Sequence, residues 1–359
     1  MRHLADVPRW CDDVPDFAGP ARSARRSLLK AAVLGRREEP GYPPAAMGED
    51  GAAAPSVLMY TVTGTILDIS PHVLVLWTEL GEQRFLLASS AAAWRGGKVA
   101  PAALRQGDHA IVRRQHPSVP VIDRIWAQAG RATGTIIERE GPATLLVDEG
   151  PGNGRKIVMI ASEAAGRIQV RFPRLEPGYL IDVIGLKHDG FLHALIPATS
   201  QPPYRAGHPP APPLASRHVP DPVNGTAVWH EPGEEPADLL GLAYPALDPE
   251  ETCERGGPAR PECAGDGHEI DPHATGPGCV RLPYLSMGSM LRLRNDCAQR
   301  SRTVPVTSCG ATARLFCDRC VTCGTSSKGR IADLTMAAFV ELGGALEDGC
   351  FTATMTIGG

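Results

Sequence analysis

The chain of 359 residues has a formal net charge of −4, and 43% of its residues are hydrophobic. This length exceeds that of a usual single domain, and the near balance of charge excludes a strongly basic surface for nucleic acids or for a polybasic membrane contact. Many prolines (34) and glycines (39), with only 5% aromatic residues, favour short strands and turns over helical bundles.

Residues 1–55 show no apolar period and are predicted to be a disordered leader. Within this leader, Arg25-Arg26 followed by Ser27-Leu28-Leu29-Lys30 looks like a twin-arginine export signal. The charged run 36–39 interrupts the apolar stretch that such a signal needs, so a basic amphipathic turn is the alternative. No stretch approaches the roughly 18 apolar residues of a membrane span. Together with the cysteines described below, the leader predicts an extracellular or cell-wall location without a membrane span.

Segments 56–130 and 131–199 are predicted to be two copies of one small β-barrel. Each offers about five short strand-like runs separated by turn residues. The run 63–66 (TGTI) recurs at 133–136, and the pattern Leu-x-x-Gly at 104–107 recurs at 175–178. Five short strands, interrupted in the middle by a segment of small or charged residues, suit a barrel of the oligonucleotide/oligosaccharide-binding kind.

Three tryptophans, Trp77, Trp94 and Trp126, fall in the first copy. We interpret them as core or barrel-mouth residues rather than as platforms for a ligand. Single-stranded nucleic acid would need a basic groove interleaved with stacking aromatics, which neither copy supplies. The pair of copies is therefore expected to serve as a scaffold or adhesion module.

Residues 200–239 are proline-rich without an apolar period and predict a semi-rigid extended linker. His208, His218 and His230 lie within this segment. Their spacing fits no metal geometry, so we expect solvated histidines rather than a metal tract.

Residues 240–359 are predicted to form a compact, cysteine-rich domain. Alternating apolar and polar residues predict strands at 289–296, 302–308 and 350–357. An apolar stripe predicts one helix over 333–342, with Asp333 as its N-cap and Gly343-Gly344 at its end.

The order of these features resembles the double-psi β-barrel of the rare lipoprotein A, barwin and expansin superfamily. The resemblance lies in Leu282-Pro283, a strand from Gly288 to Asn295, a β return ending near Gly310, and "GRIADLTMAAFVELGG" before a final strand. It covers roughly residues 240–357, and "GRIADLT" with the alanine-rich helix is its most specific part. The resemblance implies a six-stranded barrel that binds glycan strands in a groove.

Some members of this superfamily cleave peptidoglycan as lytic transglycosylases, which implies a histidine and aspartate acid/base pair. The resemblance places that pair at Cys279 and Ser308, and neither residue transfers protons near neutral pH without further activation. Asp333 matches the aspartate of a "DLS"-like motif, and it is either a groove acid or only a helix cap. Tyr284, Ser308 and Asp333 are the candidate ligand-binding residues, with Asp333 the one candidate for catalysis.

Nine of the ten cysteines lie in the C-terminal third and are disulfide candidates: Cys253, Cys263, Cys279, Cys297, Cys309, Cys317, Cys320, Cys323 and Cys350. Zinc or an iron–sulfur cluster at 317–323 would lack a fourth ligand, so no metal and no cofactor is expected. Since the two changed catalytic positions flank one groove in the superfamily, the resemblance suggests a Cys279–Cys309 bond. The odd number leaves one thiol to remain free, to pair with Cys11 or to bond to another molecule.

The sequence thus predicts a mainly β protein with two OB-like barrels, a linker and a double-psi barrel carrying one short helix. The expected function is that of a secreted, cell-wall-associated protein that binds polysaccharide or peptidoglycan through a catalytically silent barrel. One alternative is a lytic transglycosylase-like enzyme that uses Asp333. Another is an intracellular protein that binds metal or senses redox state.

Overall fold

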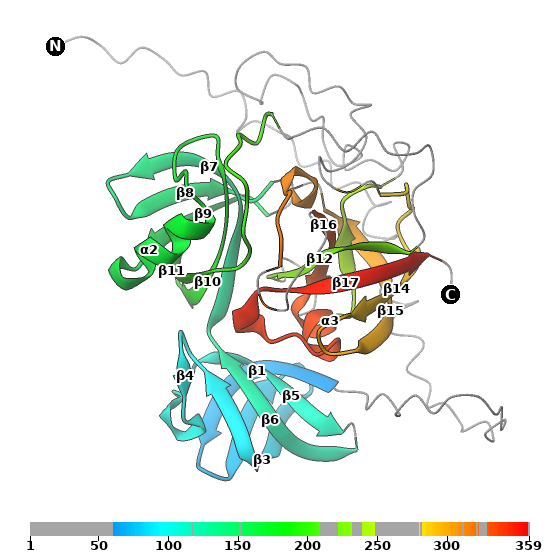
Figure 1. Cartoon of the computed structure of the whole chain (residues 1–359). Coiled ribbons are helices and arrows are strands. Elements are labelled where there is room, and N and C mark those ends of the chain that lie inside the picture. The colour runs from blue at the N-terminus through cyan, green and yellow to red at the C-terminus, as the bar shows by residue number, and fades with distance from the viewer. Residues whose placement is uncertain are drawn as a thin grey trace, which may run out of the picture. The chain divides into compact units, whose positions relative to one another are not determined.

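The computed structural model describes residues 60–116, 118–150, 153–208, 222–231, 239–247, 280, 282–310, 312–320, 322 and 329–357. All of these residues belong to one compact unit of the chain. They form three closed β-barrels of five, five and six strands, so the predicted mainly β fold is confirmed (Figure 1).

The first barrel is an OB-like barrel of five strands. It contains β1 (Tyr60–Ile69), β2 (Val73–Thr78), β3 (Gly81–Trp94), β5 (His109–His116) and β6 (Val119–Ala127), with the short β4 (Lys98–Val99) beside β3. Strand β3 closes the barrel, because it pairs antiparallel with β2 and parallel with β6. Large apolar side chains fill the interior, among them Ile66, Leu74, Leu76, Phe85 and Ile122.

The second barrel repeats this arrangement. Its elements are β7 (Ala129–Glu140), β8 (Thr144–Asp148), β9 (Arg155–Ile160), α2 (Ser162–Arg171), β10 (Leu180–His188) and β11 (Phe191–Pro197). The parallel pair is β9 with β11, in the place that β3 and β6 take in the first barrel. Helix α2 contacts β11 and buries Ala164 and Ile168 in the core of this barrel.

A close backbone approach explains why the TGTI run recurs. A Cβ atom at Gly64 would lie 2.4 Å from the carbonyl oxygen of Trp77, and one at Gly134 would lie 2.0 Å from that of Asp148. In both barrels this approach lies beside a register shift between the first two strands. Only glycine fits at these two positions, so the repeated motif marks the same crossing of strands in each barrel.

The third barrel has six strands and one short helix. Its elements are β12 (Val223–His230), β13 (Leu242–Tyr244), β14 (Met290–Asn295), β15 (Arg300–Cys309), β16 (Arg330–Thr335), α3 (Met336–Glu341) and β17 (Cys350–Ile357). The barrel order is β12-β16-β13-β15-β14-β17, with parallel pairing in β12–β16 and β13–β15. This architecture is compatible with a double-psi barrel. The strands predicted near 289–296, 302–308 and 350–357 are confirmed as β14, β15 and β17.

Strand β12 lies inside the segment that the sequence suggested to be a linker. Residues 223–230 pair with β16 and β17, and Val223, Val228 and Trp229 are fully or almost fully buried. The proline-rich composition on both sides concealed this strand, although "VNGTAVWH" contains several β-branched and aromatic residues. Residues 223–230 of the predicted linker therefore contribute one strand to the third barrel.

The prediction that Asp333 caps the helix is wrong. Helix α3 begins at Met336, and its N-cap is Thr335, whose side chain accepts a hydrogen bond from the backbone N of Ala338 at 3.3 Å. Asp333 lies two residues earlier, inside strand β16. Its carboxylate is consequently available for a different role.

The tryptophans of the first barrel have two different environments. Trp94 and Trp126 are buried in an apolar core that also includes Trp229 of the third barrel, which confirms the core interpretation for these two residues. Trp77 is instead 58% exposed, because its neighbours Leu76 and Thr78 occupy the buried positions of β2.

The second and third barrels are joined by a buried network of ion pairs. Asp182 on β10 accepts hydrogen bonds from Arg131 Nη2 and from Arg330 Nη2, both at 2.6 Å. Arg330 also pairs with Asp318, and the side chains of Asp182, Asp318 and Arg330 have no exposed surface. The Arg131 guanidinium further lies 5.3 Å from the ring centre of Trp229. These contacts fix β7 and β10 against β16.

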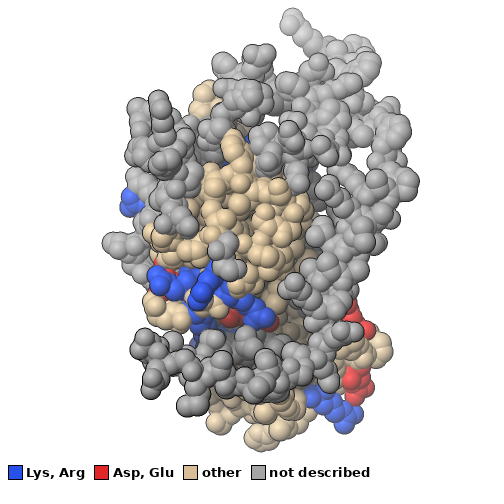
Figure 2. All heavy atoms as spheres, turned by 90° about the vertical axis from the view of Figure 1, so that its right-hand side faces the viewer, with Lys and Arg blue, Asp and Glu red and all other residues tan. Residues whose placement is uncertain are grey.

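Basic side chains gather on the face that carries β14 and β15, beside a larger uncharged surface (Figure 2). On β14, Arg292 and Arg294 are exposed and alternate with the buried Leu291 and Leu293. Arg294 Nε donates to a carboxylate oxygen of Asp296 at 2.7 Å, so part of this charge is neutralised locally. Within the described ranges, no helix is long and apolar enough to cross a bilayer.

Candidate functional site

Asp333 lies on the outer side of the third barrel. Its neighbours in β16, Ala332 and Leu334, are fully buried in the apolar core, and successive residues of a strand point to opposite faces. The Asp333 side chain is 15% exposed, which leaves one part of the carboxylate open to solvent. The strand thus presents an acidic group at the surface from an otherwise buried segment.

A row of residues from five neighbouring strands passes through Asp333. Asp333 is in register with Val228 on β12 and with Ala243 on β13. The row continues from Val228 to Cys350 on β17, and from Ala243 to Ser308 on β15. We call Cys350, Val228, Asp333, Ala243 and Ser308 the outer row. Neighbouring strands are about 4.8 Å apart, so Ser308 and Asp333 lie roughly 10 Å apart on one face.

His230 is the direct partner of Asp333. Its Nδ1 lies 3.3 Å from Asp333 Oδ1, and the His230 side chain is 18% exposed. His230 follows Val228 by two residues on β12, so the period of the strand brings its side chain to the same face as the outer row. With a proton on Nδ1, the imidazole donates a hydrogen bond to the carboxylate.

The surroundings of Asp333 favour its charged form. Burial by itself would raise the pKa of Asp333, but the His230 imidazole and the Arg330 and Arg131 guanidiniums outweigh burial and lower this pKa below its usual value. Asp333 is therefore a carboxylate at neutral pH. It can accept a proton or hold a cationic imidazole, whereas it cannot itself donate a proton in that range.

The other predicted site residues are only partly brought together. Ser308 shares the outer row with Asp333 through the register of Ala243. Tyr284 is 47% exposed in the segment before β14, outside the outer row. The neighbouring carbonyl of Pro283 accepts a hydrogen bond from the Tyr244 hydroxyl at 2.9 Å, which ties this segment to β13.

Two of the predicted disulfide candidates lie at one end of the outer row, to which Cys350 itself belongs. Cys320 and Cys350 are buried in one small cluster with Val228. The backbone N of Thr322 lies 3.5 Å from Cys320 Sγ, and the Thr322 hydroxyl lies 4.0 Å from Cys350 Sγ.

The remaining cysteines are distributed over the third barrel or lie beyond the described residues. Cys297 follows β14, Cys309 ends β15, and Cys317 is buried with its backbone N donating to Gln201 Oε1 at 3.1 Å. Outside the described residues lie Cys11, Cys253, Cys263, Cys279 and Cys323. The suggested Cys279–Cys309 bond therefore stays a prediction. In the described part of the chain, no group of three or more His, Cys, Asp or Glu side chains is arranged to hold a metal ion.

Sequence reasoning missed His230 because composition placed it in a linker. The available signal was the run 223–230, whose β-branched and aromatic residues precede the histidine. The contact itself depends on the parallel register of β12 and β16, which joins residues 103 positions apart. His208 lies in a turn after the second barrel and not on β12, the strand that carries His230. His218 lies outside the described residues.

A comparison of the chain with models of known protein families finds no match, and a comparison with curated proteins finds none either. The assignment of a function therefore rests on the geometry of the third barrel and on the resemblance seen in its sequence.

Proposed function

We propose that the third barrel binds a glycan strand, either a cell-wall polysaccharide or peptidoglycan, at the end of the outer row that carries Asp333 and Ser308. The observation that carries this proposal is the position of Asp333. It is a charged, partly exposed residue on a barrel strand, and the helix cap that would have explained it is supplied by Thr335. A carboxylate held in this way is suited to accept hydrogen bonds from sugar hydroxyls.

The polar part of the outer row spans three strands. It runs from Ser308 to Asp333, a distance of roughly 10 Å at about 4.8 Å per strand, because Val228 and Cys350 at the other end of the row are buried. The row includes the Ser308 hydroxyl and the Asp333 carboxylate, with the His230 imidazole beside it, and these groups are separated by the small Ala243. Polar groups spaced along an otherwise apolar strip are typical of sites that orient a ligand through a few hydrogen bonds.

The binding experiment uses the full chain and two insoluble ligands, purified peptidoglycan sacculi and cellulose. We expect co-sedimentation with at least one of them, and loss of most binding in Asp333→Asn. The matched control is Asp189→Asn, because Asp189 is an exposed aspartate in the turn between β10 and β11 of the second barrel. If Asp333→Asn bound the ligand as well as the control Asp189→Asn does, the assignment of the site to Asp333 would be contradicted.

A second candidate function, cleavage of the bound glycan, is favoured by the 3.3 Å contact between His230 and Asp333. A charged carboxylate that orients a histidine is the arrangement that lets imidazole transfer protons. In an intramolecular cleavage, a protonated His230 would give its proton to the leaving glycosidic oxygen while a hydroxyl of the same sugar attacks. The proton of that hydroxyl would then return to the imidazole, and the product would be an anhydro sugar.

Binding and cleavage are separated by scoring them in the same incubation with sacculi. Release of anhydro-muropeptides that is abolished by both His230→Asn and Asp333→Asn would establish cleavage. Sedimentation without release would leave the barrel as a catalytically silent binding module, as the changed positions Cys279 and Ser308 suggest.

The proposal includes export from the cytoplasm. Support comes from Arg25-Arg26 in the leader and from the clustering of nine cysteines, a pattern typical of disulfide-containing proteins in oxidising compartments. Fusion of residues 1–55 to a reporter that is active only outside the cytoplasm tests the route. Replacement of both arginines by lysine should abolish the signal if the twin-arginine pathway is used.

A further inference from the structure

A cavity lies between the end of α2 and two segments of the chain near residues 200 and 319. It has a volume of about 330 Å³, within the range of small-molecule sites. Arg171 and Arg319 contribute the charged part of its lining, and Ser200 and Gln201 contribute further polar groups. Val170 and Pro202 supply apolar surface, and no acidic side chain is among its described lining residues.

The backbone holds the two arginines on opposite sides of residues 200 and 201. Ser200 and Arg319 form an antiparallel bridge, with N to O distances of 3.2 and 3.1 Å. The backbone N of Gln201 donates to the carbonyl oxygen of Arg171 at 3.2 Å. These backbone hydrogen bonds fix the main-chain positions of both arginines without using their side chains. The guanidinium groups can therefore interact with a ligand in the cavity.

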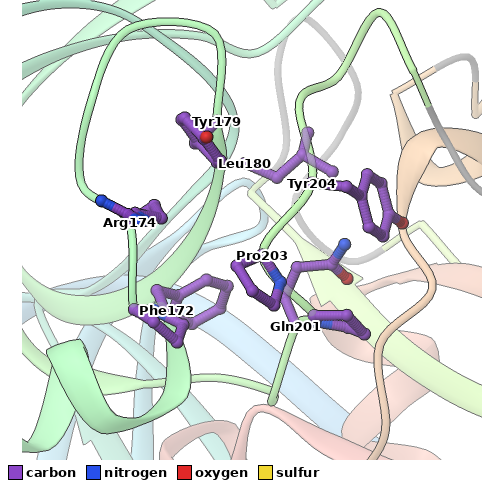
Figure 3. A pocket seen from close by; sticks show the side chains of 9 residues that line it. Phe172, Arg174, Tyr179, Leu180, Gln201, Pro203 and Tyr204 are labelled. Atoms are coloured by element: carbon purple, nitrogen blue, oxygen red, sulfur yellow. The ribbon is translucent and has the colours of Figure 1, made fainter.

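Gln201 adds a buried polar group at this place. It is 5% exposed, its Oε1 accepts from Cys317 N at 3.1 Å, and its Nε2 makes no hydrogen bond of ordinary geometry within the described residues. Gln201 also lines an adjacent cavity of about 10 Å³, together with Phe172, Tyr179 and Tyr204 (Figure 3). That smaller cavity is about the size of one water molecule, and a water there would satisfy the amide.

We propose that the 330 Å³ cavity binds an oxyanion, a carboxylate or a phosphate group, carried on a small and partly apolar ligand. The planar guanidinium of arginine matches both groups through paired hydrogen bonds. Two arginines without an acidic neighbour in the lining create the positive potential that attracts such a group, and Val170 and Pro202 cover its apolar part. This site uses none of the residues of the outer row, so it is independent of glycan binding.

The test is a titration of the full chain with benzoate, phenyl phosphate and uncharged benzyl alcohol, followed by calorimetry or ligand-observed NMR. We expect saturable binding of at least one of the two anions that weakens with added salt. Whichever of the two anions binds more tightly identifies the group. Arg171→Gln and Arg319→Gln should each weaken that binding at least about tenfold. Arg314→Gln makes the same charge change at an exposed position outside the cavity and should leave the affinity unchanged.

Three results would overturn the proposal: no saturable binding of either anion, equal affinity for benzyl alcohol, or equal weakening by Arg314→Gln. Thermal unfolding of each variant shows whether it is folded before its affinity is compared. Because both arginines are held through backbone atoms, the two glutamine variants are expected to retain the wild-type unfolding temperature.

Discussion

Arg330 of the third barrel and Asp182 of the second form an ion pair at 2.6 Å in which neither side chain has exposed surface. Arg330 also neutralises Asp318, and its guanidinium lies 4.1 Å from the ring centre of Phe316. We therefore predict that Arg330→Ala lowers the free energy of unfolding by about 3 to 5 kcal/mol, since it removes the cation that pairs with buried Asp318 and leaves buried Asp182 with Arg131 alone. Chemical denaturation measures this loss.

The control for that variant is Arg292→Ala on the exposed side of β14. A surface arginine of this kind is expected to change the free energy of unfolding by no more than about 0.5 kcal/mol. Losses of similar size in the two variants would contradict the importance of the buried network.

The N-cap of α3 makes a second prediction. Thr335 accepts from Ala338 N, and its hydroxyl also donates to the Leu239 carbonyl at 2.6 Å. Thr335→Ala should cost about 1 to 2 kcal/mol of stability, whereas Thr335→Ser should cost much less, because serine keeps the hydroxyl. Equilibrium unfolding in denaturant compares the two variants, and equal losses would show that the methyl group rather than the cap matters.

Glu341 at the end of α3 gives a pH dependence. Burial raises its pKa to about 7 despite the nearby Arg302, from an ordinary value of 4.5. The folded state then binds this proton more tightly than the unfolded state. Stability therefore falls as pH rises from about 4.5 to about 7, by up to about 3 kcal/mol, and changes no further above that range.

Glu341→Gln isolates this effect, because glutamine has the shape of the neutral acid. The difference in unfolding free energy, wild type minus variant, should decrease across the same pH window. Parallel curves for the two proteins would show that Glu341 stays ionised through its contact with Arg302.

A fourth prediction concerns Cys320 and Cys350, which share contacts with Val228 and Thr322. We predict that they form a disulfide when the protein folds in the presence of oxidised glutathione. The two thiols lose two protons and two electrons, and one molecule of oxidised glutathione is reduced to two molecules of the thiol. Peptide mapping without reductant should recover the Cys320–Cys350 pair, and Cys350→Ser should abolish it. Recovery of Cys320 joined to another cysteine in the wild type would contradict the pairing.

Local sequence patterns predicted the first two barrels because short strands alternate regularly and the glycines of the TGTI run recur at the same crossing, whereas the six-stranded barrel was expected from the resemblance of residues 240–357. They misplaced the start of α3 because Asp333 and Thr335 are both good N-caps, two residues apart, before one apolar stripe. Which of the two caps the helix depends on how far β16 extends, and that is decided by pairing with β12 and β13. The contact of His230 with Asp333 likewise follows from a parallel register between distant strands, which no local pattern encodes.

The shared apolar core has an optical consequence. Trp94 and Trp126 from the first barrel and Trp229 from the third lie in one cluster, while Trp77 is exposed on β2. Indole emission shifts to longer wavelength when the ring becomes wetted. In a denaturation experiment, a red shift of tryptophan emission that precedes the loss of the β-sheet circular dichroism signal would therefore show that the first and third barrels separate before the individual barrels unfold.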